Sequence, residues 1–219
     1  MTNHKSDRYE TLAASHSEEI PKIKGSRFVA DAYPVESPEA AAECIEEIRR
    51  RYHDASHHCF AYRLGPEGIP FRSSDDGEPS GSAGAPILRQ IESSGLSDVL
   101  VVVTRYFGGT KLGTGGLVRA YGDAAAAVLR SAKRRTRQLY ASFELVFDYE
   151  DTAPVMRLID QFEARVTSSR YGERTTLMVE VPRLRADSFA AGFVENLRGR
   201  GGNSRTWSPA GGVGWSDDR

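Results

Sequence analysis

The sequence predicts an α+β protein built from two domains. The chain has 219 residues, a length that suits one large or two small domains. Residues 99–103 form an unbroken apolar run typical of a strand buried on both faces, and a glycine-rich loop and a helix follow it. From about residue 140 the patterns run β-α-β-β-α, which favours a compact ferredoxin-like sandwich.

Local signals define the elements of the first domain. Ser37 and Pro38 supply a cap and an N1 proline for a helix whose apolar residues recur on one face. A short helix that starts at Pro86 is stopped by Gly95. The predicted elements are strands at residues 27–33, 57–64 and 99–103 and helices that start near residues 38, 86 and 117.

The second half of the chain has a different pattern of apolar residues. Phe143, Leu145 and Phe147 alternate with polar or smaller residues, which indicates a half-buried strand. A capped helix, two strand-like runs joined at Gly172 and a last helix follow. The predicted organisation is a flexible N-terminus at residues 1–19, a first domain at 20–135, a second domain at 136–207 and a flexible tail at 208–219.

Composition limits the partners and the compartment. The net charge is −1 and the isoelectric point is about 6.5, so any contact with nucleic acid requires a local basic patch. Cys44 and Cys59 form neither a disulfide framework nor a metal-binding spacing. No apolar run has the length of a signal peptide core or a membrane span. We therefore expect a cytoplasmic protein without a membrane partner.

The glycine-rich loop carries the clearest chemical signal. Its five glycines lie between a buried strand and a helix N-terminus, where free amides and the helix dipole favour an anion. The alternative is that the glycines only allow tight packing of the loop under the sheet, and the residues alone leave both interpretations open. The predicted anion or nucleic-acid site comprises Arg105, Lys111, Gly113, Thr114, Gly115, Gly116 and Arg119.

This loop is not a standard nucleotide motif. A P-loop would need lysine where Thr114 stands, and the dinucleotide fingerprint would need glycine where Val118 stands. Arg119 has two interpretations. It either completes the anion site from the helix or forms an ordinary surface pair with Asp123, four residues further on.

Asp75, Asp76 and Glu78 place three carboxylates within four positions. Such carboxylates can hold Mg²⁺ or act as acid and base. A turn is the favoured alternative, because Asp-Gly and Pro-Ser-Gly form turns in which side chains bond their own main chain. A carboxylate-held Mg²⁺ facing a phosphate on the glycine loop would instead make the protein a phosphotransferase.

His57 and His58 are adjacent on a predicted strand, so they point to opposite faces and do not readily bind one metal together. One of them lines the site or both are structural. Cys44 and Cys59 are expected to pack in the core. We predict no catalytic residue and no metal ligand set.

Three blocks resemble the IMPACT/YigZ family: HHCFAYR at 57–63, SDDGEPSGSAG at 74–84 and VTRYFGGTKLGTGGLVRAY at 103–121. The resemblance is strong over residues 25–132 and weaker beyond. Ser82 stands where the family usually has threonine, and Ala85 where a basic residue is common. The second difference weakens a cationic patch.

The resemblance implies a ribosomal-protein-S5-domain-2-like fold, followed by a ferredoxin-like domain similar to a C-terminal domain of elongation factor G. Eukaryotic relatives regulate translation through the amino-acid-starvation kinase pathway, using an additional N-terminal domain that we do not expect here. No established catalytic residue comes with the family.

Three functions are therefore considered. The leading one is a translation-associated protein that docks on RNA, the ribosome or a translation factor through its glycine loop, without a cofactor. The second is a Mg²⁺-dependent phosphotransferase or hydrolase, which rests on fold analogy alone. The third is a regulator that binds only protein.

Overall fold

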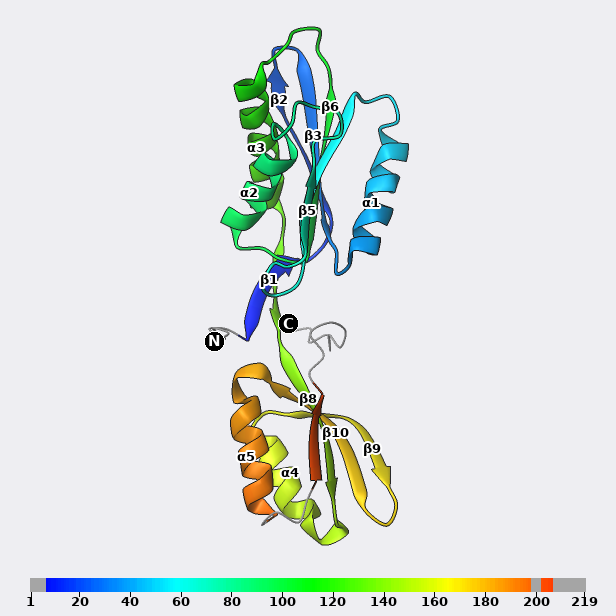
Figure 1. The fold of residues 1–219 in the computed structure, drawn as a ribbon, viewed down its shortest axis with the longest axis vertical. Helices are drawn as coiled ribbons and strands as arrows, with labels where there is room; N and C mark the ends of the chain where they lie inside the picture. Colours follow the sequence, from blue (N-terminus) through cyan, green and yellow to red (C-terminus); the bar gives the residue numbers. More distant parts are fainter. Residues whose placement is uncertain (1–6, 198–201, 207–219) are drawn as a thin grey trace. The chain divides into compact units, whose positions relative to one another are not determined.

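A computed structural model describes residues 7–197 and 202–206 and divides the chain into two units (Figure 1). One unit comprises residues 9–137, and the other combines residues 1–8 with 138–219. The division falls between Arg137 and Gln138. Both units mix helices with strands, so the chain has the expected α+β composition.

The unit of residues 9–137 is organised around a five-stranded sheet in the order β2-β3-β6-β4-β5. All neighbouring strands in it are antiparallel. A separate two-stranded sheet pairs β1 with β7. The strands are β1 (Arg8–Leu12), β2 (His16–Ile23), β3 (Ser26–Pro34), β4 (His57–Arg63), β5 (Phe71–Ser74), β6 (Val99–Tyr106) and β7 (Arg134–Gln138).

Helices cover both faces of this sheet, with α1 (Pro38–Arg51) on one and α2 (Gly84–Ser94) and α3 (Thr114–Ser131) on the other (Figure 1). The central strand β6 is buried on both sides. Val101 packs in the core shared with α2 and α3, whereas Val102 packs in the core beneath α1. The prediction of a strand buried on both faces is confirmed.

The helix signals in the sequence also act as predicted. The Ser37 hydroxyl accepts a hydrogen bond from the amide of Ala40 at 3.1 Å and so caps α1. Gly95, with φ of 73°, ends α2 in the left-handed conformation.

Part of the segment predicted to be flexible is instead ordered. Within residues 1–19, β1 and the first half of β2 are strands, while residues 1–6 lie outside the described residues. Local sequence gives little sign of them, because β2 is polar and has no fully buried side chain. Its main-chain hydrogen bonds to β3 hold it in place, and β1 adds the buried side chains of Thr11 and Leu12.

The second unit contains a four-stranded antiparallel sheet in the order β11-β8-β10-β9. Phe143, Leu145 and Phe147 of β8 are buried, which confirms the predicted alternation. The sequence analysis missed β11, because its Gly-Asn-Ser-Arg-Thr sequence carries no apolar alternation; the predicted tail lies outside the described residues. The elements are β8 (Tyr140–Phe147), α4 (Thr152–Gln161), β9 (Arg165–Tyr171), β10 (Thr175–Pro182), α5 (Ala186–Asn196) and β11 (Gly202–Thr206).

Among the helices within the described ranges, none combines the length and apolar character needed to cross a bilayer.

Candidate anion-binding site

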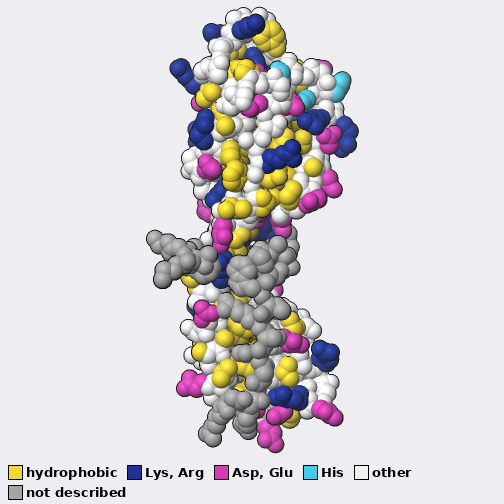
Figure 2. Space-filling model, viewed as in Figure 1, with side chains coloured by type: hydrophobic (Ala, Val, Ile, Leu, Met, Phe, Trp, Pro, Cys, Tyr) yellow, Lys and Arg dark blue, Asp and Glu magenta, His cyan; other side chains and the backbone are white. Residues whose placement is uncertain are grey.

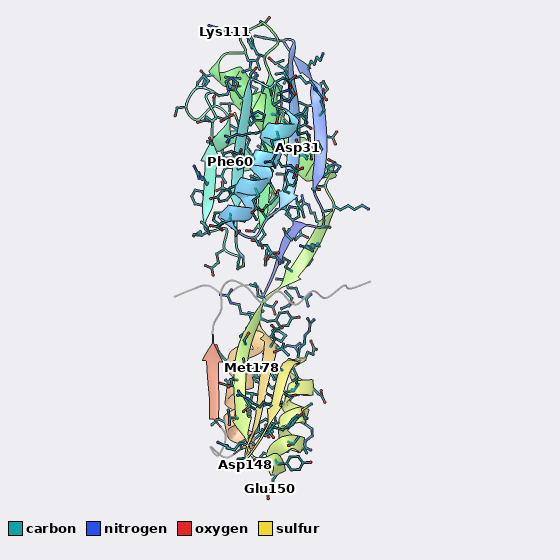
Figure 3. All side chains as sticks on the ribbon, turned by 90° about the vertical axis from the view of Figure 1, so that its right-hand side faces the viewer. Asp31, Phe60, Lys111, Asp148, Glu150 and Met178 are labelled. Atoms are coloured by element: carbon teal, nitrogen blue, oxygen red, sulfur yellow. The ribbon has the colours of Figure 1, made fainter. Side chains whose placement is uncertain are left out.

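The three sequence blocks meet at one end of the five-stranded sheet. His57 on β4 is the register partner of Arg105 on β6, so both side chains lie on the sheet face that α2 and α3 cover. Glu78 reaches the same place from the loop between β5 and α2. The glycine loop connects β6 to α3, and Lys111 lies at its tip (Figure 3).

Arg105 is buried beneath the loop, with a side chain that is 5% exposed. Its Nη1 donates to Oε1 of Glu78 at 2.6 Å, and its Nη2 donates to the Ser26 hydroxyl at 3.3 Å. Its guanidinium also lies 5.5 Å from the ring centroid of Phe107. Since Glu78 neutralises it, Arg105 positions the loop instead of offering a free charge to a phosphate.

Glu78 is equally well satisfied. Its Oε1 accepts a second hydrogen bond, from the hydroxyl of Tyr121 on α3, at 2.7 Å. Burial, the nearby Cys59 and the bond to Glu78 all raise the pKa of Tyr121 far above its usual value. The hydroxyl therefore stays protonated and acts as a donor. Glu78 thus links β6 to α3 through two buried donors.

Hydroxyl groups fix the start of the loop. The amide of Phe107 donates to the Ser56 hydroxyl at 3.1 Å, and the amide of Gly108 donates to the Ser26 hydroxyl at 3.2 Å. A Cβ on Gly108 would lie 1.9 Å from the carbonyl carbon of Gly25. Tight packing therefore accounts for this glycine.

The end of the loop is different. Gly113 has φ of 75° and precedes α3 without capping it by a side chain. The first hydrogen bond of α3 runs from the amide of Leu117 to the carbonyl of Gly113. The amides of Thr114, Gly115 and Gly116 find no acceptor among the residues described, and Thr114 and Gly115 are exposed. They present the positive end of the helix dipole to the surface.

Two exposed cations stand near these amides in the sequence. Lys111 lies in the loop and Arg119 lies in the second turn of α3. Within the described ranges, neither forms an ion pair, and the surface pair expected between Arg119 and Asp123 does not form. On the face seen in Figure 2, basic and acidic side chains are interspersed, so positive charge is not gathered into a broad field.

The carboxylate of Asp75 accepts hydrogen bonds from the main chain. Its Oδ1 accepts hydrogen bonds from the amides of Ala83 and Gly84 at 2.9 and 2.8 Å, and its Oδ2 accepts one from Gly81 at 2.8 Å. Burial alone would raise the pKa of Asp75, but these three bonds outweigh it and hold the pKa below its usual value. The carboxylate therefore caps the start of α2.

Asp76 is also engaged. Its Oδ2 accepts from the amide of His58 at 2.7 Å, and its Oδ1 lies 3.2 Å from Nη2 of Arg49. Because the oxygens of both aspartates face NH groups, they do not fit a Mg²⁺ site, and no metal-binding group of three ligands occurs among the described residues. The turn interpretation fits Asp75, which bonds the main chain of its own loop, whereas Asp76 and Glu78 pair with residues of other elements.

The two histidines lie on opposite faces of the sheet, as predicted. His57 joins the site: its Nδ1 lies 2.9 Å from the carbonyl oxygen of Asp76, and its Nε2 lies 3.9 Å from Oε1 of Glu78. His58 turns toward the α1 side, where its Nε2 lies 3.1 Å from the carbonyl oxygen of Tyr52.

Cys59 is a core residue, in agreement with the sequence analysis. Its thiol is fully buried and donates to the carbonyl oxygen of Asp75, with an Sγ–O distance of 2.9 Å. Burial raises the pKa of Cys59 to about 12. The thiol therefore stays protonated at neutral pH and is a poor nucleophile.

Sequence reasoning missed four residues of this site: Ser26, Ser56, Phe107 and Tyr121. The hydroxyl groups of Ser26, Ser56 and Tyr121 have partners far along the chain, so no local pattern marks them. The Tyr121 hydroxyl and its acceptor Glu78 are 43 residues apart, and Ser26 is 82 residues from Gly108.

The fold and the site define a two-unit α+β protein that presents a glycine loop and an uncapped helix N-terminus on a buried Arg–Glu support. Family models match the Impact N-terminal domain over residues 24–129 and a domain of unknown function (DUF1949) over residues 145–200. The IMPACT family member YigZ of Escherichia coli (strain K12) is 34% identical over 182 residues, 82% of this chain and 89% of that protein. The chain therefore belongs to the IMPACT family.

Two further likenesses differ in extent. Protein IMPACT of Oryctolagus cuniculus is 34% identical over 109 residues, which are 44% of this chain but only 34% of that protein. The crystal structure of a hypothetical protein is similar with a TM-score of 0.67 and 32% identity, covering 90% of this chain and 97% of the other. The second likeness extends through both units.

Proposed function

We propose that this protein is a translation-associated binding protein that docks on RNA through the glycine loop and the N-terminus of α3. Gly115 carries the proposal. Its φ is not positive, and a Cβ there would meet nothing within 4 Å, so neither strain nor packing requires glycine. Glycine in a helix costs about 0.5–1 kcal/mol relative to alanine. Close approach of a ligand gives a reason for it.

The chemistry of the site favours a phosphate. Free amides at Thr114, Gly115 and Gly116 donate hydrogen bonds and carry the positive helix dipole. Lys111 and Arg119 supply charge that no partner among the described residues neutralises. With a net charge of −1, the protein has no overall positive field, so we expect contact with only one or two phosphates.

The family supports a role in translation. Its resemblance implies an S5-domain-2-like fold for the unit of residues 9–137. For the second unit we infer a ferredoxin-like arrangement, which the antiparallel strand order β11-β8-β10-β9 and the helices α4 and α5 support. Folds of both kinds occur in ribosomal proteins and translation factors. The cytoplasm is the compartment that such a role requires.

Binding of a labelled single-stranded RNA, measured by fluorescence anisotropy at several salt concentrations, tests the proposal. We expect affinity to fall with salt, and Lys111→Ala to reduce the slope of log K against log salt by about one. Gly115→Ala should weaken binding by crowding the phosphate, although it should slightly stabilise the fold.

Gly122→Ala is the matched control. Gly122 lies in the same helix, and a Cβ there would make only an ordinary contact, 3.8 Å from Nε2 of Gln90. This variant should stabilise the fold like Gly115→Ala but leave binding unchanged. Affinity that does not depend on salt, or equal effects of the two alanines on binding, would overturn the proposal. Capture of a protein partner that survives nuclease treatment would favour the protein-only regulator instead.

A further inference from the structure

Phe107 is an exposed aromatic residue at the start of the glycine loop. Its side chain is 51% exposed, although it directly follows the buried strand β6. The other large exposed apolar residues around the same sheet, Ile69 and Phe71, belong to β5 and the turn before it. Phe107 is therefore set apart from them by its place beside the loop.

Contacts with Arg105 and Ser56 fix the position of the Phe107 ring. The guanidinium of Arg105 lies 5.5 Å from the Phe107 ring centroid, within the range of a cation–π contact. Arg105 is itself held by Glu78 and Ser26. The amide of Phe107 is bonded to the Ser56 hydroxyl. An exposed ring that is already ordered loses little conformational entropy when a ligand stacks on it.

The ring begins the loop of residues 107–113, and the free amides follow the end of that loop, in the first turn of α3. One end offers a flat apolar surface and the other offers hydrogen-bond donors to an anion. A nucleotide combines a flat base with a phosphate, so its chemistry matches both ends. A paired base cannot present its face to a side chain, so the matching ligand is single-stranded.

We propose that Phe107 is a stacking platform for an unpaired base of single-stranded RNA whose phosphate lies at the N-terminus of α3. This inference rests on the proposed function and specifies the ligand more closely. It assigns Arg105 and Glu78 the role of positioning residues, because they act on the ligand only through the ring and the loop.

The test compares two labelled probes of equal length, an oligouridine and an abasic ribose-phosphate oligomer, with the full-length protein. Phe107→Ala should weaken binding of oligouridine by about 5- to 100-fold, the usual effect of losing a base–aromatic stack. The same variant should bind the abasic probe like the wild type. Phe107→Leu keeps apolar bulk without an aromatic face, and it should behave like alanine.

Phe107→Trp gives an independent readout. It should retain affinity for oligouridine, and its fluorescence should be quenched when a base stacks on the indole. The chain contains two other tryptophans, so the signal is taken as the difference from wild type. Thermal melting of each variant reports whether the fold is intact.

The outcomes separate this inference from the proposed function. Binding of both probes that responds to Lys111→Ala, with no effect of Phe107→Ala, would overturn the stacking role and leave the phosphate role standing. If the wild type binds neither probe in a salt-dependent way, both the stacking role and the proposed function are overturned. Equal loss of both probes in Phe107→Ala with an unchanged melting temperature would show that Phe107 does not read a base.

Discussion

Glu78 and Arg105 form a buried ion pair, with Oε1 and Nη1 at 2.6 Å and both side chains at most 5% exposed. They lie 27 residues apart, on a loop and on the central strand of the sheet. Through Tyr121 and Ser26 the same pair reaches α3 and the first residue of β3. The support of the glycine loop is therefore one connected set of hydrogen bonds.

Removing one partner of this pair should destabilise the protein strongly. Glu78→Gln leaves the Arg105 guanidinium buried without a compensating charge, and we expect the free energy of unfolding to fall by about 3–5 kcal/mol. Urea denaturation measures the loss. The exposed pair of Arg51 and Glu47 provides the control, since Glu47→Gln should cost less than about 1 kcal/mol. A similar cost at both positions would contradict a buried pair.

Gly108→Ala should be destabilising. The added Cβ would lie 1.9 Å from the carbonyl carbon of Gly25, and main-chain atoms of β2–β3 turn residues cannot move aside as a flexible side chain would. We expect a cost of about 1–3 kcal/mol, as for other overpacked sites, seen as a lower melting temperature. Gly109 has open space around it but φ of 85°, so Gly109→Ala tests conformational strain without a clash.

Asp31→Asn should stabilise the protein at neutral pH. Asp31, labelled in Figure 3, is 2% exposed, and its Oδ2 has no hydrogen-bond partner among the residues that the structure describes. Burial raises its pKa, against weaker opposition from Ser17 and from Arg51 at 3.7 Å. The contribution of protonated Asp31 to the stability of the protein is therefore fully present below the unfolded pKa of about 3.9. It is lost as pH rises through the raised folded pKa.

The pH dependence gives the check on this prediction. Denaturation at pH 7 should give the asparagine variant a larger free energy of unfolding than the wild type. The difference between the two should shrink toward pH 3. A variant that is less stable than the wild type at pH 7 would mean that the contact with Arg51 outweighs the cost of burying the charge.

Asp75→Asn should have the opposite effect and destabilise the protein at neutral pH. The pKa of Asp75 is lowered in the folded state because its three main-chain hydrogen bonds outweigh burial. Its stabilising contribution is present above the unfolded pKa of about 3.9 and is lost as pH falls through the lower folded pKa. An asparagine offers one acceptor oxygen, so the amides of Gly81, Ala83 and Gly84 cannot all keep their partners.

The experiment is again a comparison of two pH values. The variant should be less stable than the wild type at pH 7, and the difference should narrow below pH 4. A constant difference across this range would indicate that shape, and not charge, makes Asp75 matter.

Local patterns predicted most elements of the fold. The apolar run at 99–103, the Ser37 cap and the Gly95 stop each act within a few residues, and the structure confirms them. The strands that were missed are β1, β2, β5, β7 and β11, which are short or largely polar and are held by main-chain pairing with other strands. Such pairing leaves no periodic signal in the strand's own sequence.

The candidate site divides in the same way. The sequence spacing indicated the loop glycines and the helix N-terminus after them, and it left Arg119 between the anion site and a pair with Asp123 that does not form within the described ranges. It did not indicate the burial of Arg105, because its partner Glu78 was read as a member of an acidic turn. A charged residue can be assigned to a ligand or to the core only when its partner in space is known.

The pairing of β1 with β7 brings together the first and last strands of the unit formed by residues 9–137. The amide of Ala13, just after β1, also donates to the carbonyl of Lys133, just before β7. The two chain ends of this unit are thus neighbours, so residues 9–137 could be transferred to another protein as one segment. It could be spliced into a surface loop of another protein, or reopened with new ends at an exposed turn, without stretching the chain.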